Sequence, residues 1–350
     1  MITYVLPLRC EVCAAGDHEE LVAYLRRLSR HASVIIADGS AWRAYALHSR
    51  MFGRNVRHLP VDDDVAGFAN GKVAGVTTGV RAALTERVIV ADDDVRYTAS
   101  SLEAMARVLD LADLVIPQNA FPSGAQPWHV RWDGARSLVN RAIDFDPPGT
   151  LGLRRSAFLA AGGYDGEVLF ENLELIRTIA ATGGGVAVRR DIAIERLAPT
   201  AHRFLEQRVR QAYDEFARPR RLVAFLAIAP ATAWLTRRAR WSPIAVAAVA
   251  IAVAEVGRRR DGGREMFPAL TPLFAPLWVA ERAVCSWLAL GSRLLRGGVP
   301  YRGRVLRRSA TPMRQLRARH GMAPLHVNRH TAASSGNGHI GTAARSHAGS

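Results

Sequence analysis

The chain has 350 residues, a formal net charge of +16 at pH 7 and 49% hydrophobic residues. That hydrophobic content is enough for a sizeable core in one large or two medium domains, while three Cys exclude a disulfide-stapled small fold. The excess of positive charge indicates an anionic partner, such as nucleic acid, a phosphorylated ligand or anionic lipid.

Arg supplies nearly all of the positive charge, because Lys72 is the one Lys among 47 basic residues. Together with abundant Ala, Gly and Val, this bias is typical of a GC-rich bacterial genome. A single Lys in a chain whose default cation is Arg marks Lys72 as a residue to examine.

Residues 1 to about 195 alternate between predicted strands and helices. A capping box is expected from Ser100 and Glu103. Repeated strand–helix–strand units predict a mostly parallel sheet covered by helices, with ligands beyond the carboxyl ends of the strands. Asp38 and residues 92–94 fall at such ends. The strands are expected at 2–8, 33–38, 55–61, 87–92 and 112–118, and the helices at 17–30, 41–50, 71–84 and 100–111.

The second part of this region is less regular. Residues 119–150 are rich in Pro, Gly and Trp, and we expect a long irregular segment there. A helix over 170–182 and a strand over 185–197 follow. We therefore predict one α/β domain spanning residues 1–220.

The composition changes after about residue 220. Residues 221–292 contain three apolar runs and are predicted to be hydrophobic, membrane-associated helices. A membrane hairpin, interfacial or re-entrant elements, and buried soluble helices all remain open. Residues 293–350 are predicted to be a basic, largely disordered tail whose Arg residues could hold anionic lipid headgroups.

Three consecutive acids, Asp92, Asp93 and Asp94, follow the predicted strand "RVIVA". A solvated turn, a phosphoryl-accepting Asp and a divalent-metal site holding a diphosphate would each look like this. The eleven His show no metal-ligand spacing. The triplet therefore does not decide its own role.

The neighbouring segments narrow the choice. "SVIIADGS", "NGKVAGVTTGVRAAL", "VIVADDDV", "GTLGLRRSAFLAAGGYDGEVLFENLEL" and "QRVRQ" occur in that order. This series resembles family 2 of the inverting glycosyltransferases, which have the GT-A fold, a Rossmann-like α/β architecture. The resemblance covers roughly residues 2–215. With the apolar segments that follow, the chain is similar to the membrane-attached branch of ceramide glucosyltransferases and polysaccharide synthases.

The resemblance implies roles on the donor side. Asp38 would contact the nucleotide base or ribose, Lys72 would lie near the nucleotide, and Asp92 would face the ribose. Asp94 would ligate a Mg²⁺ or Mn²⁺ ion that bridges the diphosphate. Asp93 is expected to point elsewhere, because neighbouring side chains in extended backbone face opposite ways.

On the acceptor side, the family places a Glu-Asp pair at a helix start, where this chain has Glu171 and Asn172. We expect Glu171 to be the base. Glu174, one turn further on, is expected to be structural. "QRVRQ" resembles the Q-x-x-R-W signature with Gln211 in place of Trp. Gln207 and Arg210 would then hold the acceptor or the diphosphate. These two regions are where the chain departs from the family pattern.

The resulting prediction is a metal-assisted inverting glycosyltransferase. It would move a hexose from a nucleotide-diphospho-sugar to a lipid or lipid-linked acceptor, and a UDP-sugar is the donor we expect. Anionic membrane lipids, and not nucleic acid, are the other expected partners. Because "MITYVLPLRC" reads as a strand and not as a signal peptide, the catalytic domain is expected on the cytoplasmic face of the cell membrane. A catalytically degenerate membrane scaffold and an Asp-based phosphotransferase are the alternatives.

Overall fold

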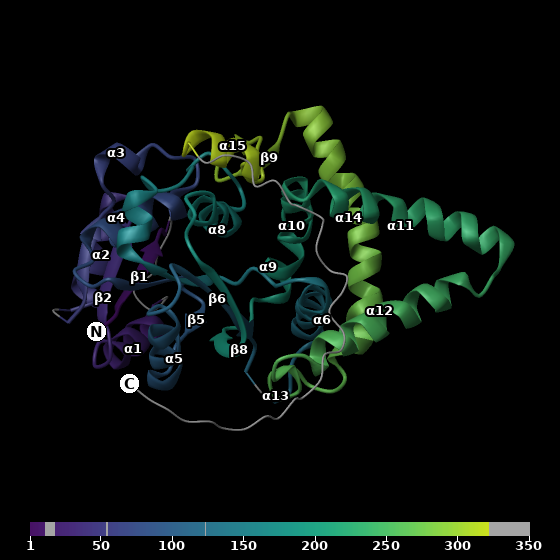
Figure 1. Ribbon diagram of the computed structural model, residues 1–350, viewed down its shortest axis with the longest axis horizontal. Helices are drawn as coiled ribbons and strands as arrows, with labels where there is room; N and C mark the ends of the chain where they lie inside the picture. Colours follow the sequence, from purple (N-terminus) through teal and green to yellow (C-terminus); the bar gives the residue numbers. More distant parts are fainter. Residues whose placement is uncertain (11–17, 54, 123, 322–350) are drawn as a thin grey trace, which may run out of the picture.

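A computed structural model describes residues 1–10, 18–53, 55–122 and 124–321. Within them, an eight-stranded sheet is flanked by helices, and a long helical hairpin projects from the opposite side of the molecule (Figure 1). The order across the sheet is β3-β2-β1-β4-β7-β6-β8-β5. The strands are β1 (Thr3–Leu8), β2 (Ser33–Asp38), β3 (Arg57–Pro60), β4 (Arg87–Ala91), β5 (Val95–Arg96), β6 (Leu114–Ala120), β7 (Thr150–Arg154) and β8 (Val186–Arg196).

Strands β3, β2, β1 and β4 are parallel, so their carboxyl ends lie at one edge of the sheet. Strand β7 runs antiparallel between β4 and β6, and β8 returns parallel to β6. The predicted mostly parallel α/β sheet is therefore present, with β7 and the short edge strand β5 antiparallel to their neighbours. Asp38, the last residue of β2, and residues 92–94, which follow β4, therefore lie along this edge.

Helices cover both faces of the sheet. They are α1 (Glu19–Leu28), α2 (Trp42–Met51), α3 (Asp63–Ala66), α4 (Gly71–Ala82), α5 (Ala99–Val108), α6 (Trp128–Ile143), α7 (Arg155–Ala160) and α8 (Glu171–Ala181). Alternate residues of β1 pack into the cores on opposite faces of the sheet, because neighbouring side chains of a strand point in opposite directions. Tyr4 and Leu6 join the core under α1 and α5, whereas Val5 joins the core under α4 and α8.

Two sequence-based expectations are wrong in this domain. Residues 119–150 are not irregular throughout, because α6 occupies 128–143. Its polar residues are buried yet bonded: Arg136 contacts Asp133 and Asp146, so a helix can lie inside the protein without a clear apolar stripe. The capping box of α5 is formed by Thr98 and Ser101, and not by Ser100 and Glu103.

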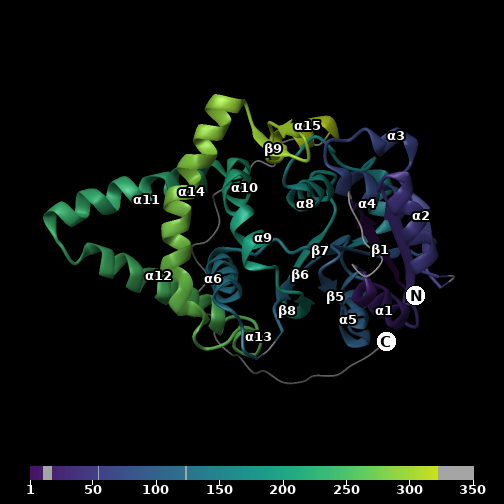
Figure 2. The same ribbon diagram turned by 180° about the vertical axis from the view of Figure 1, so that it is seen from behind.

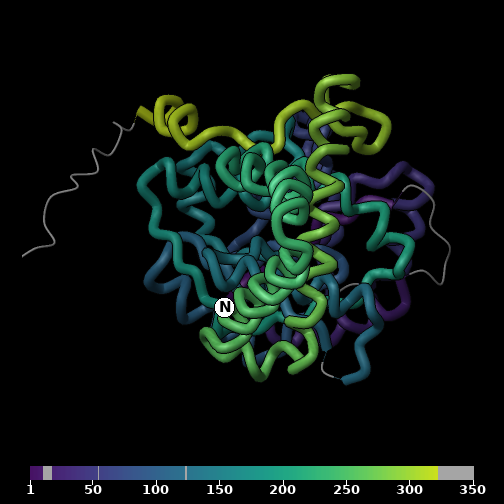
Figure 3. The backbone as a smooth tube through the Cα atoms, turned by 90° about the vertical axis from the view of Figure 1, so that its right-hand side faces the viewer, coloured from purple at the N-terminus to yellow at the C-terminus, as the bar shows by residue number. Residues whose placement is uncertain are grey.

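The chain continues as helices packed beside the sheet domain. They are α9 (Ala201–Glu206), α10 (Arg208–Tyr213), the 3₁₀ turn η1 (Asp214–Ala217), α11 (Pro219–Arg238), α12 (Ser242–Arg259), α13 (Gly263–Met266), the 3₁₀ turn η2 (Thr271–Phe274) and α14 (Ala275–Arg296). Helices α11 and α12 form the projecting hairpin, and α14 crosses its base (Figures 1 and 2). Figure 3 shows the hairpin end-on, in front of the body.

The base of the hairpin is fixed to the sheet domain. Ala254 of α12 is fully buried in a cluster with Leu138 of α6 and Trp278 of α14. Gly257 allows this approach, because a Cβ there would lie 1.9 Å from the Leu138 carbonyl oxygen. The two helices are therefore docked at one end only.

The tail is more ordered than the sequence predicted. Residues 293–296 belong to α14, and β9 (Val299–Tyr301), β10 (Arg304–Leu306) and α15 (Met313–Arg319) follow. The backbone N–H of Thr311 donates to the carboxylate of Glu174, and Leu316 is buried. The prediction of disorder is wrong for residues 293–321, and its remainder lies outside the described residues.

Candidate active site

A cavity of about 1100 Å³ opens beside the carboxyl ends of β1 and β4. Helix α14 and strand β9 form its far wall. Six of the seven predicted site residues line it: Lys72, Asp92, Asp94, Glu171, Gln207 and Arg210. Asp38 is not among its lining residues.

Lys72 lies between two acids of this cavity. Its Nζ is 2.6 Å from Asp92 Oδ1 and 3.0 Å from Glu171 Oε1. Asn70 fixes the start of α4, since its side-chain oxygen accepts from the Lys72 backbone N–H at 3.1 Å. The Asn70 amide also donates to Glu171 Oε2 at 3.3 Å, which ties α4 to α8. Lys72, Asp92 and Glu171, from three separate segments, therefore form one cluster.

Asp92 begins a tight turn at the end of β4. The Val95 N–H donates to the Asp92 carbonyl at 3.1 Å, and the Asp92 N–H donates to the Gly149 carbonyl at 2.9 Å. A Cβ on Gly149 would lie 2.6 Å from Asp92 Oδ2. The glycine that opens the "GTLGLRR" segment is thus required for the Asp92 side chain to sit where it does.

The same turn separates Asp93 from Asp94. Asp94 Oδ2 is 2.8 Å from Arg196 Nε, while Asp94 Oδ1 is buried and without a hydrogen-bond partner. Asp93 is exposed and lines the cavity together with Asp92 and Asp94. The expected alternation of side chains does not apply, because these residues lie in a turn beyond the end of β4 and not in a strand. Nothing in the sequence pointed to Arg196 as the partner of Asp94.

The charges of this cluster do not balance. Three carboxylates, those of Asp92, Asp94 and Glu171, are in direct contact with two cations, Lys72 and Arg196. Burial, together with the charges of Asp94 and Glu171, raises the pKa of Asp92 to about 6, although Lys72 acts to lower it. Burial opposes the charge of Lys72, yet Asp92 and Glu171 hold its pKa far above the ordinary value.

This imbalance fits a divalent cation. Asp92 and Asp94 supply the hard carboxylate oxygens that Mg²⁺ and Mn²⁺ prefer, and the buried Oδ1 of Asp94 is a ligand atom with no other partner. A cation there would neutralise the excess charge of the cluster. Asp92 and Asp94 are therefore the residues of the cavity that could hold a metal.

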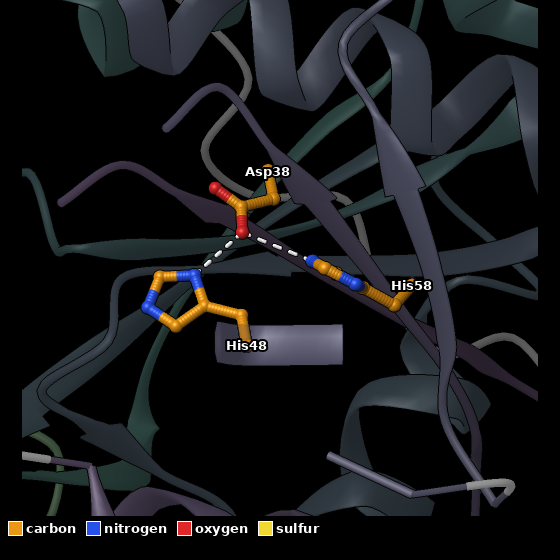
Figure 4. Close-up of side chains that lie close together, drawn as sticks. All are labelled: Asp38, His48 and His58. Atoms are coloured by element: carbon orange, nitrogen blue, oxygen red, sulfur yellow. Dashed lines mark hydrogen bonds and ion pairs between the residues drawn. The ribbon is translucent and has the colours of Figure 1, made fainter. Parts of the chain in front are cut away.

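Asp38 occupies a separate, buried site. Its Oδ2 accepts from His48 Nδ1 at 2.6 Å and lies 2.9 Å from His58 Nε2, and Figure 4 shows both rings directed at this oxygen. Burial raises the pKa of Asp38, but bonds from His58, Ser40 and His48 outweigh it and lower the pKa to about 2. The Asp38 side chain is fully buried. A direct nucleotide contact would require it to leave its partners.

Asp38, His48 and His58 also form a group of possible metal ligands. The Ser49 hydroxyl donates to the Tyr45 carbonyl at 3.0 Å, and the same hydroxyl oxygen lies 3.0 Å from His58 Nδ1. The three ligand atoms lie within 4.8 Å of one another and could hold a metal ion such as Zn²⁺. The sequence spacing of the His gave no hint of this cluster.

Around Glu171, the cavity differs from the pattern of the family that the sequence resembles. Asn172 donates from its amide to the Pro148 carbonyl at 2.7 Å, and Glu174 is fully buried. Burial alone would raise the pKa of Glu171, but Lys72 lowers it below the ordinary value. Asp214 also lines the cavity, a residue that sequence reasoning missed.

Arginines surround this end of the cavity. Arg210 lies over the Tyr301 ring, 5.6 Å from its centroid. The lining also includes Arg136, Arg218, Arg221 and Arg282. Trp287, Leu288 and Leu295 of α14 add an apolar wall. The cavity can therefore accept a ligand with both anionic and apolar parts.

No protein-family model matches the chain, and no curated protein matches its sequence. A solved structure of the mannosyltransferase PcManGT from Pyrobaculum calidifontis, in complex with GDP-Man and Mn²⁺, is similar with a TM-score of 0.51. It is 16% identical, over 84% of this chain and 87% of that chain. The two chains share a fold.

This likeness confirms the α/β fold that the sequence predicted. Mannosyl-3-phosphoglycerate synthase from Rubrobacter xylanophilus is 13% identical over 59% of this chain and 69% of that chain, with a TM-score of 0.39. S. aureus TarS 1-349 is 12% identical over 87% and 95%, also with a TM-score of 0.39. Of these three structures, PcManGT is the one whose TM-score is high enough to support a shared fold.

Proposed function

We propose that this protein is a metal-assisted inverting glycosyltransferase. It moves a hexose from a nucleotide-diphospho-sugar to the hydroxyl of a lipid or lipid-linked acceptor. The observation that carries this proposal is the Lys72–Asp92–Asp94–Glu171 cluster, which lines an Arg-rich cavity at the carboxyl edge of the sheet. Ligands of open α/β sheets bind at this edge.

The donor would lie over the ends of β1 and β4. Asp92 and Asp94 would hold Mg²⁺ or Mn²⁺, which supplies a Lewis acid for the diphosphate when bound. Lys72 directs a compact ammonium toward the same place and stabilises charge on the leaving diphosphate. Glu171 and Asn70 hold that ammonium in position. Gln207 and Arg210 line the acceptor side of the cavity and would contact the acceptor or the diphosphate.

A donor screen tests the proposal. Thermal shift is measured with UDP-, GDP- and TDP-sugars, each with Mn²⁺ and with EDTA. We expect one nucleotide class to raise Tm by several degrees with Mn²⁺ only, since a ligand at 100 times its Kd stabilises by about 2.7 kcal/mol. No shift with any donor would contradict the proposal. Binding without turnover on total lipid extract would favour a degenerate scaffold, for which Asn172 and Gln211 are the evidence.

We also propose that the catalytic domain lies on the cytoplasmic face of the cell membrane, attached by α11, α12 and α14. Helix α11 has 20 residues, but Arg220, Arg221, Arg237 and Arg238 lie at its ends, so its apolar middle is shorter than the about 20 residues that cross a bilayer core. By length and composition, one helical segment of the described chain, Thr271–Arg296, could cross a membrane. Large apolar side chains are exposed on all three helices: Val223, Trp234, Leu235, Ile244, Val249, Val256, Leu277, Val284, Trp287, Leu288, Leu294 and Leu295.

Vesicle flotation tests this attachment. Trp241, at the hairpin tip, is 66% exposed, and Trp42, on the sheet domain, is 77% exposed. We expect the protein to float with vesicles, more strongly when they contain anionic lipid, because Arg237 and Arg238 flank the apolar surface. Trp241→Glu should weaken flotation severalfold, and Trp42→Glu should not. Equal effects of the two substitutions would contradict this orientation. A separate measurement, the accessibility of the catalytic domain to protease in inverted membrane vesicles, would test whether it lies on the cytoplasmic face.

A further inference from the structure

Glu171, the acid expected to take the acceptor proton, and its neighbour Glu174 both have other partners in the structure. Glu171 Oε1 pairs with Lys72, and Oε2 accepts from Asn70. Glu174 is fully buried, and its Oε2 accepts from the Thr311 backbone. The carboxylate of Glu171 is therefore ionised but held by a cation, and a carboxylate whose pKa is lowered in this way is a weak base.

Asp214 differs from these acids. It begins η1, directly after α10, and lines the cavity. Its Oδ1 is buried without a hydrogen-bond partner, and no residue of the described chain forms an ion pair with its carboxylate. Its backbone is fixed instead, because the Ser309 hydroxyl donates to the Asp214 carbonyl at 2.8 Å. Its neighbour Tyr213 is fully buried. The carboxylate is thus held in place without being neutralised.

The charges around Asp214 come from three helices and its own turn. Glu171 of α8 and Glu215 of η1 are acids, while Arg210 of α10 and Arg282 of α14 are cations. Burial raises the pKa of Asp214 well above its ordinary value, and Glu171 raises it further. Glu215, its neighbour, is instead paired with Arg221 at 3.1 Å. An unpaired buried carboxylate lowers stability, so its retention beside a cavity points to function.

We propose that Asp214 is the general base of the glycosyl transfer, a role that rests on the function proposed above. The acceptor hydroxyl gives its proton to the Asp214 carboxylate. At the same time the acceptor oxygen forms a bond to the anomeric carbon of the donor sugar. The bond from that carbon to the diphosphate oxygen breaks, and the leaving nucleoside diphosphate takes the electron pair. Protonated Asp214 then releases the proton to solvent. In this arrangement Glu171 positions Lys72.

The test compares Asp214→Asn and Asp214→Glu with Asp110→Asn. Asp110 does not line the cavity, and its half-exposed side chain pairs with Arg87. Two quantities are measured for each protein: the Kd for UDP and GDP with Mn²⁺ by calorimetry, and nucleotide release from UDP-, GDP- and TDP-sugars with total lipid extract. Nucleotide release is followed from pH 5 to 9.

We expect Asp214→Asn to lower kcat at least ~100-fold while the nucleotide Kd changes less than about threefold. The fall of kcat at acidic pH should disappear from its residual activity, and Asp214→Glu should recover part of the rate. Asp110→Asn should behave as the wild type. Asp214→Asn should also raise Tm at pH 8 by a few degrees, because it removes a buried carboxyl group that no cation of the described chain pairs with.

Other outcomes overturn the assignment in distinguishable ways. Turnover by Asp214→Asn within threefold of the wild type removes Asp214 as the base and leaves the proposed function standing. A drop in Tm together with lost nucleotide binding means that Asp214 is structural. Wild-type protein that binds neither nucleotide, or that binds without turnover, removes the transfer function and the base with it.

Discussion

Asp94→Ala will weaken the Mn²⁺-dependent binding of a nucleoside diphosphate at least ~100-fold. Mutation of a residue that only supports a metal ligand already lowers metal affinity by about 10–100-fold, and Asp94 is proposed to be a ligand itself. The variant removes the buried Oδ1 that has no partner within the protein. It also frees Arg196, which keeps a contact with Asp133 at 3.8 Å. Some metal-independent binding through arginines should therefore survive.

The measurement is calorimetric titration of UDP and of GDP, with Mn²⁺ and with EDTA. Asp93→Ala is the matched control, because Asp93 is the neighbouring residue, it also carries a carboxyl group, and it is exposed. We expect its Mn²⁺-dependent Kd to stay within twofold of the wild type. If both variants lose binding equally, the effect belongs to the net charge of the turn and not to a ligand at Asp94.

Lys72→Met will lower both stability and nucleotide binding. The ammonium is the shared partner of Asp92 and Glu171, and its side chain is 16% exposed. Removing one member of a buried charge cluster costs roughly 3–5 kcal/mol, which we reduce to about 2–3 kcal/mol because Asp92 is 31% exposed. Denaturation with urea measures this loss directly.

Lys72→Arg is the control for Lys72→Met. It keeps the charge but not the compact ammonium, so it should recover most of the stability and less of the nucleotide affinity. Saturating Mg²⁺ should also restore part of the stability of Lys72→Met, because a divalent cation can pair with the same carboxylates. A Lys72→Met protein as stable as the wild type, with unchanged nucleotide affinity, would show that the cluster does not depend on this residue.

Much of the sheet domain could be predicted because its signals are local. Strand 33–38 is β2, helix 71–84 is α4, and helix 170–182 is α8, each within two residues. Helix α6 was not predicted, because polar residues occupy many of its buried positions and interrupt the apolar periodicity. In the folded protein, Arg136 of this helix pairs with Asp133 and Asp146. The hydrophobic pattern alone cannot show that a polar side chain is satisfied by a partner elsewhere in the fold.

The sequence by itself determined the acids at the strand ends, the single Lys, the acidic start of α8 and all strands of the main sheet except β5 and β7. These features depend on neighbouring residues, through periodicity and the geometry of strand ends. The tertiary structure alone decided which charges are paired. Arg196 meets Asp94 across 102 residues, Asp38 turns away from the cavity to His48 and His58, and Asp214 is left unpartnered. Such pairings follow from packing between distant segments, which no local pattern encodes.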